Sequence, residues 1–243
     1  MESNPALSLA IVCGFFAIFA GMIALVVFAA QKQKAKRDKF AQAHGFTEVK
    51  DSSALLERVA YVNGVTRLDL YRLFQVYRRT SSSGGEVYLF NLMRHSVHRG
   101  HRAGGGHSTR IRTHPLETEA FAFVAPSWHL PIFTAMPRLQ GGLLADMGNR
   151  LAEMAADIKM DVVKFPHLPE VDEKYLIAAP DNSLTLPDAF LQAMASHPNL
   201  HVHAGGDTLT LSYSNSTTQP PDIAALEKLY KIGLQLAKVI QAK

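Results

Sequence analysis

Arginine and histidine are concentrated in residues 87–116, a segment without Asp or Glu. Guanidinium groups present a rigid fork of N–H donors, so five of them in one segment can bind phosphate or carboxylate. Closely spaced imidazoles can bind Zn, Cu or Ni. The segment therefore predicts a site for an anion or an acidic partner, with a metal site as the alternative. The candidate anion- or partner-binding residues are Arg94, Arg99, Arg102, Arg110 and Arg112, and the alternative metal ligands are His95, His98 and His101.

The middle of this segment, residues 99–107, is too rich in glycine and charge to form a core. We expect a long, mobile hairpin loop near residues 95–113. Three interpretations stay open: a solvated loop without a ligand, a contact with lipid headgroups or an acidic partner subunit, and a metal site. No carboxylate or cysteine lies near the histidines, so we expect no resident metal or cofactor. The loop has no aromatic side chains to stack on bases, so we expect no nucleic-acid partner.

The chain matches none of the common catalytic patterns. It has no P-loop, no dinucleotide-binding glycine fingerprint, no His-Glu-x-x-His and no Gly-x-Ser-x-Gly. His201 and His203 alternate on a predicted strand, where an exposed polar face explains them better than a metal clamp does. These observations favour a protein that is not an enzyme.

Composition excludes two classes of protein. Of the 243 residues, 47% are hydrophobic, which is too many for a disordered chain. The single cysteine, Cys13, excludes an internal disulfide framework and a Cys-based zinc site.

The two halves of the chain differ in charge. Residues 1–116 carry 16 Lys and Arg against 7 Asp and Glu, whereas residues 117–243 carry 9 against 14. The basic half can meet anionic lipid, nucleic acid or an acidic partner, or the two halves can neutralise each other within one domain.

Residues 5–30 contain no charged side chain. A helix of this length would cover about 39 Å at ~1.5 Å per residue, more than the ~30 Å hydrocarbon core of a bilayer. The segment therefore predicts a transmembrane helix. A cleaved signal peptide is the weaker alternative, because residues 1–4 lack a basic side chain.

A basic cluster follows this apolar run. By the positive-inside rule it places the N-terminus outside and the main domain in the cytoplasm, so we expect a single-pass protein of the plasma membrane. The cluster can also contact anionic headgroups through Lys32, Lys34, Lys36, Arg37 and Lys39. Small residues recur along the run and predict a contact with another membrane helix or a homo-oligomer, through Ala10, Gly14, Ala17 and Gly21.

The remaining periodicity predicts a mixed domain over residues 46–243, preceded by the transmembrane part, residues 1–30, and a basic juxtamembrane helix, residues 31–45. Alternating apolar residues predict a hairpin with Leu200 and Val202 on one face and the two histidines on the other. The prolines near residues 128–138 predict an extended loop. The predicted strands are residues 65–77, 86–93, 119–125 and 174–179, and the predicted helices are residues 52–60, 143–158, 185–197 and 220–240.

The expected fold class is α+β: one N-terminal transmembrane helix, then a soluble domain with a largely antiparallel sheet and helices packed on one face. Several short segments follow the anchor and the basic juxtamembrane helix: His44-Gly45-Phe46, Ala125-Pro126, Leu130-Pro131-Ile132-Phe133, Met136-Pro137-Arg138 and Glu173-Lys174-Tyr175-Leu176-Ile177. Their order resembles that of uncharacterised bacterial single-pass membrane proteins with a cytoplasmic domain of unknown function. The resemblance implies a bacterial inner membrane but no activity and no catalytic residues, and the Gly/His-rich insertion departs from it.

These features predict a non-catalytic, membrane-anchored accessory or scaffold subunit. Its helix would pack in a larger membrane protein complex, and its cytoplasmic domain would dock on a partner subunit. The alternative is a metal- or ligand-binding module that uses the His-rich loop. An unrecognised hydrolase is the third hypothesis, because residues brought together only by folding leave no sequence pattern.

Overall fold

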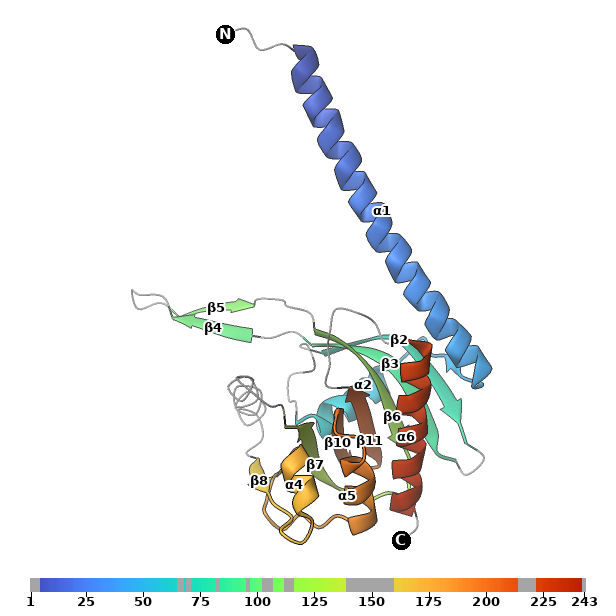
Figure 1. The fold of residues 1–243 in the computed structure, drawn as a ribbon, viewed down its shortest axis with the longest axis vertical. Helices are drawn as coiled ribbons and strands as arrows, with labels where there is room; N and C mark the ends of the chain where they lie inside the picture. The colour runs from blue at the N-terminus through green and yellow to red at the C-terminus, as the bar shows by residue number, and fades with distance from the viewer. Residues whose placement is uncertain are drawn as a thin grey trace. The chain divides into compact units, whose positions relative to one another are not determined.

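The computed structural model describes residues 5–64, 68, 71–81, 84–94, 97–101, 107–111, 116–138, 160–213 and 222–241 (Figure 1). The chain divides into two compact units, Met1–His44 and Gly45–Lys243.

The first unit contains one continuous helix, α1 (Pro5–Ala43). The amide of His44 still donates to the Phe40 carbonyl, at 3.1 Å, and Gly45 then turns the chain with a φ of 70°. This is the predicted stop, since a left-handed glycine commonly ends a helix. Lys34 and Asp38 form an ion pair of 3.0 Å one turn apart near the end of the helix.

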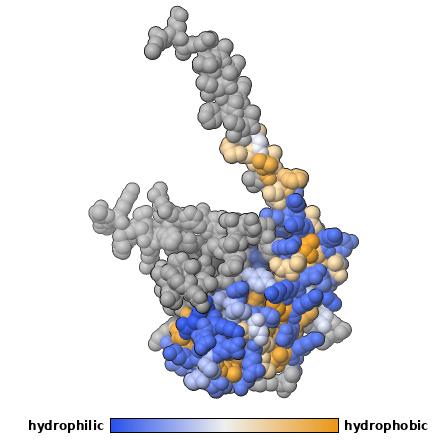
Figure 2. Space-filling view, in the orientation of Figure 1, coloured by the Kyte–Doolittle hydropathy of each residue, from blue (hydrophilic) through white to orange (hydrophobic). Residues whose placement is uncertain are grey.

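The predicted membrane-spanning helix over residues 5–30 is the main correction to the expected fold class. In the part of the chain that the structure describes, no helix is both long and apolar enough to cross a bilayer. The described side chains of α1 begin at Phe19, and charge begins at Lys32, so α1 changes from hydrophobic to hydrophilic along this stretch (Figure 2).

The second unit is an α+β fold built on a large antiparallel sheet. Its described strands follow the order β1-β2-β3-β6-β11-β10-β7-β9-β8, and all the pairings between them are antiparallel. The sheet thus confirms the predicted antiparallel architecture. The strands are β1 (Thr47–Glu48), β2 (Tyr71–Thr80), β3 (Glu86–Arg94), β6 (Leu116–Val124), β7 (Leu130–Pro137), β8 (Asp161–Val163), β9 (Tyr175–Ala179), β10 (Leu200–Gly206) and β11 (Thr208–Tyr213).

The hairpin of β10 and β11 has the predicted arrangement of side chains. Its register pairs His201 with Ser212 and His203 with Thr210. Because paired residues of antiparallel strands share a face, the histidines lie on the opposite face from Leu200 and Val202.

Strand β7 replaces the extended loop that the prolines predicted. It lies inside the sheet, between β10 and β9. Pro131 falls where the register with β10 shifts between Ala204 and Gly206, and Pro137 is the last residue of the strand. A proline is tolerated at such an irregularity or at a strand end, because no ladder hydrogen bond depends on its missing N–H there.

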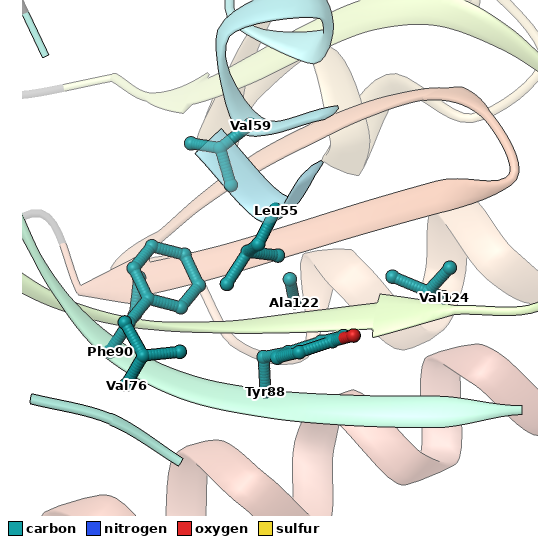
Figure 3. Close-up of a cluster of buried hydrophobic side chains, with 8 residues drawn as sticks. Leu55, Val59, Val76, Tyr88, Phe90, Ala122 and Val124 are labelled. Atoms are coloured by element: carbon teal, nitrogen blue, oxygen red, sulfur yellow. The ribbon is translucent and has the colours of Figure 1, made fainter. Parts of the chain in front are cut away.

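Helices cover both faces of the sheet, which corrects the prediction of helices on one face. Helix α2 (Ser53–Val62) packs Leu55 and Val59 against Val76, Tyr88 and Phe90 and the small side chains of β6 (Figure 3). On β6, residues alternate between faces, so Phe121 and Phe123 point the other way. There they meet Tyr230, with ring centroids 5.5 and 6.5 Å away. The second face carries α4 (Pro169–Lys174), α5 (Asp188–Ala195) and α6 (Ile223–Gln241).

Helix α6 lies very close to the sheet at Gly233. A Cβ atom placed there would lie 2.1 Å from Cε2 of Phe123 and 2.9 Å from Cδ1 of Leu211. Only glycine permits this approach, because both neighbours are buried. The helix predicted over residues 143–158 lies outside the described residues.

Candidate functional site

The second unit contains a pocket of about 540 Å³ at one end of the face that α5 and α6 cover. The pocket, called the Trp128 pocket below, collects side chains from segments far apart in the sequence. The segment between β6 and β7 and the segment before α5 form two of its walls. Its lining comprises residues 127–131 and 185–187, with Phe133, Phe190, Ala204, Ile240 and Gln241.

The topology of the sheet positions Trp128. The chain leaves β6 and must pass the end of the β10–β11 hairpin before it enters β7. On this path the amide of Ala125 donates to the Asp207 carbonyl at 2.9 Å, and the amide of Trp128 donates to the Ala125 carbonyl at 2.9 Å. The turn that carries Trp128 is therefore tied to the sheet by backbone hydrogen bonds.

The floor of the pocket is apolar and rigid. Phe133 on β7 and Phe190 on α5 meet edge to face with centroids 6.0 Å apart, and each is 1% exposed. Ala204 and Leu186 complete the floor and are also buried. Since the rings and Ala204 stand on two strands and a helix, the floor is part of the folded core.

The rim of the pocket is polar and exposed. Ser127, His129, Thr185 and Gln241 lie there. The Nδ1 atom of His129 lies 3.1 Å from the carbonyl oxygen of Ser127. A carbonyl only accepts, so Nδ1 carries the proton, and Nε2 of the neutral ring is left as an acceptor.

Trp128 has an unsatisfied polar atom. The side chain is 7% exposed, and its Nε1 atom is buried without a hydrogen-bond partner in the described structure. Burying an N–H group without an acceptor costs about 1–3 kcal/mol. An acceptor that reached this donor would recover that cost.

The pocket is electrically neutral. The described lining contains no Asp, Glu, Lys or Arg, and His129 is its one titratable side chain. A charged ligand would lose hydration there without gaining a counter-ion. The lining also offers no pair of ionisable groups for general acid–base chemistry.

The predicted polar face of the β10–β11 hairpin forms a hydrogen-bonded cluster that does not line the Trp128 pocket. His203 is half-buried rather than exposed, and its Nδ1 lies 3.0 Å from the hydroxyl of buried Thr134. The Thr210 hydroxyl donates to the His203 carbonyl at 3.3 Å. Across the described ranges, no three His, Cys, Asp or Glu side chains gather into a metal site.

The structure gathers few of the predicted anion- and metal-binding residues. Strands β4 (Val97–His101) and β5 (His107–Ile111) form a small sheet of their own, which pairs His98 with Arg110 and Arg99 with Thr109. Arg94 ends β3. His101 ends β4 and pairs with His107. Arg102, Arg112 and His95 lie outside the described residues.

The residues predicted to pack helices and bind lipid all lie on α1. The side chains of Ala10, Gly14 and Ala17 are outside the described part of the structure. A Cβ atom at Gly21 would meet nothing within 4 Å. Lys34 pairs with Asp38 within the helix, and the cluster with Lys32, Lys36, Arg37 and Lys39 stays a predicted lipid contact.

Sequence reasoning treated residues 128–138 as a structural loop and missed the pocket. The available signal was the only tryptophan of the chain, set among three prolines. Its partners Phe190, Ala204 and Ile240 are 62 or more positions away, so only the fold identifies them. Comparisons with protein-family models, with curated proteins and with solved structures found no match to this chain.

Proposed function

We propose that Gly45–Lys243 is a non-catalytic binding module that holds a small, uncharged ligand in the Trp128 pocket. The observation that carries the proposal is a pocket of about 540 Å³ with a buried aromatic floor and an exposed polar rim. Small-molecule sites typically have volumes of roughly 300–1,000 Å³ and combine apolar walls with a few polar groups.

The position of the floor residues supports binding without a large rearrangement. Phe133 and Phe190 are held by strand β7 and helix α5, and they contact each other directly. A floor that is already ordered loses little conformational entropy when a ligand enters.

The chemistry of the lining supports binding rather than catalysis. His129 could exchange a proton, but no carboxylate accompanies it in the described lining. Acyl transfer and hydrolysis require a nucleophile with a positioned base, and the base itself is commonly oriented by a third group. The chemistry of the lining therefore favours a binding module over an unrecognised hydrolase.

A docking function is the second proposal, and it concerns other residues. Strands β4 and β5 pair only with each other among the described strands, so their hairpin lies outside the nine-stranded sheet. A hairpin that carries Arg99 and Arg110 outside the main sheet suits an acidic partner subunit. Replacing both arginines with alanine is expected to weaken association at low salt, and unchanged association would count against this proposal.

The ligand-binding proposal is tested with the intrinsic fluorescence of Trp128, because it is the only tryptophan in the chain. Titration with N-phenyl-1-naphthylamine, an uncharged aromatic probe, is expected to quench this emission saturably. The substitution Thr185→Tyr places a bulky side chain on the rim and should weaken binding by about tenfold, or ~1.4 kcal/mol. Asn182→Tyr is the matched control, since Asn182 is exposed nearby but does not line the pocket. A linear, non-saturating response in the unmodified protein would refute the proposal.

A further inference from the structure

We infer that the ligand of the Trp128 pocket is a neutral aromatic compound with a hydrogen-bond acceptor, and that Trp128 Nε1–H donates to this acceptor. The inference rests on the proposed function and adds the chemical class of the ligand. It combines three properties of the lining: aromatic floor residues, the absence of charge among the described lining residues, and one unsatisfied donor.

The floor favours an aromatic ligand over an aliphatic one. Trp128, Phe133 and Phe190 all line the pocket, and the two phenylalanines already meet edge to face. A ligand ring can extend this arrangement, because ring edges are electropositive and ring faces electronegative. An alkyl chain would bury the same area without that added attraction.

The lining favours a neutral ligand. A carboxylate or phosphate would need an arginine or lysine, and a cation would need a carboxylate. The described lining supplies none of these side chains. Polar substituents of a neutral ligand can instead face Ser127, Thr185 and Gln241 at the rim.

The indole N–H determines which polar atom the ligand carries. Indole Nε1 is a donor only, so its partner must be an acceptor such as a ketone, ether or ring nitrogen. Nε1 is fully covered, so the indole must turn in place to meet this acceptor. The inference therefore includes a reorientation of the indole when the ligand binds.

The test compares four probes of similar size by isothermal titration calorimetry on the full chain. The reference is 2-acetylnaphthalene, whose ketone is the acceptor. The others change one property each: 2-isopropenylnaphthalene lacks the acceptor, 2-naphthoate adds a negative charge, and 2-acetyldecahydronaphthalene lacks the aromatic rings. We expect 2-acetylnaphthalene to bind about 3- to 10-fold more tightly than the hydrocarbon, the effect of one net hydrogen bond.

Two further measurements assign that difference to Trp128. In Trp128→Phe the preference for the ketone over the hydrocarbon should disappear, whereas Tyr61→Phe, at an exposed aromatic outside the pocket, should retain it. If Trp128→Phe does not fold, the single indole N–H resonance of the unmodified protein provides the readout. This resonance should shift downfield with the ketone and not with the hydrocarbon.

The outcomes separate the inference from the proposed function. Equal affinity for ketone and hydrocarbon would overturn the acceptor and leave the binding function standing. Tighter binding of 2-naphthoate would overturn neutrality, and equal binding of the saturated ketone would overturn the aromatic requirement. Absence of binding by all four probes would overturn the proposed function and the inference together.

Discussion

Helix α6 makes two very different contacts with the same face of the sheet. At Gly233 the helix backbone lies so close that no side chain fits between it and Phe123. Two turns later, Ile240 and Gln241 border a pocket of about 540 Å³. The difference follows from side-chain size: a glycine permits close contact, whereas large rings on separate elements leave space between them. One helix–sheet layer can therefore supply both rigidity and a binding site.

Equal truncations in these two regions should have unequal effects on stability. Phe121→Ala removes a fully buried ring from the closed region and should lower the free energy of unfolding by about 3–5 kcal/mol. Phe190→Ala removes an equally buried ring beside the existing pocket, so we expect a loss nearer ~3 kcal/mol. Urea denaturation of both variants measures the difference. Equal losses would show that the pocket region is packed as tightly as the closed one.

The close approach at Gly233 should tolerate no added methyl group. Gly233→Ala would place Cβ within 2.1 Å of a Phe123 ring atom, and we expect a loss of about 1–3 kcal/mol from overpacking. Alanine normally favours a helix over glycine by about 1 kcal/mol, so a stabilised variant would contradict the observed contact. The control is Gln235→Ala, at an exposed position of the same helix.

The smallest expected effect is a dependence of stability on pH at the contact between α5 and α6. Burial, and secondly the positive charge of Lys228, lower the pKa of His197 from its ordinary value of 6.5. The unfolded chain then binds more protons than the folded chain, so the free energy of unfolding should fall as pH drops below about 6.5. Thermal melts of the unmodified protein and of His197→Gln between neutral and mildly acidic pH measure this slope. A slope that is equally steep in the variant would assign it to other groups.

The local sequence pattern was sufficient to predict several helices and strands. Alternation from Leu200 to Tyr213 predicted both the hairpin and the face of each histidine, and the register confirms it. The helix predicted over residues 220–240 is observed as α6, which buries Leu226, Leu229 and Tyr230. These predictions succeed because a strand or helix that buries one face repeats its apolar residues with a fixed period.

Other features were decided by tertiary structure. Prolines disfavour a central strand locally, yet β7 accommodates Pro131 at a register shift and Pro137 at its end. Local pattern also could not show that α2 and α6 cover opposite faces. The predicted membrane span followed from hydropathy alone, and the described helices do not support it.

The sequence by itself thus determined the elements with regular periodicity and an antiparallel α+β sheet. The Trp128 pocket was decided by the fold, because its residues meet only through pairing between distant strands and helices.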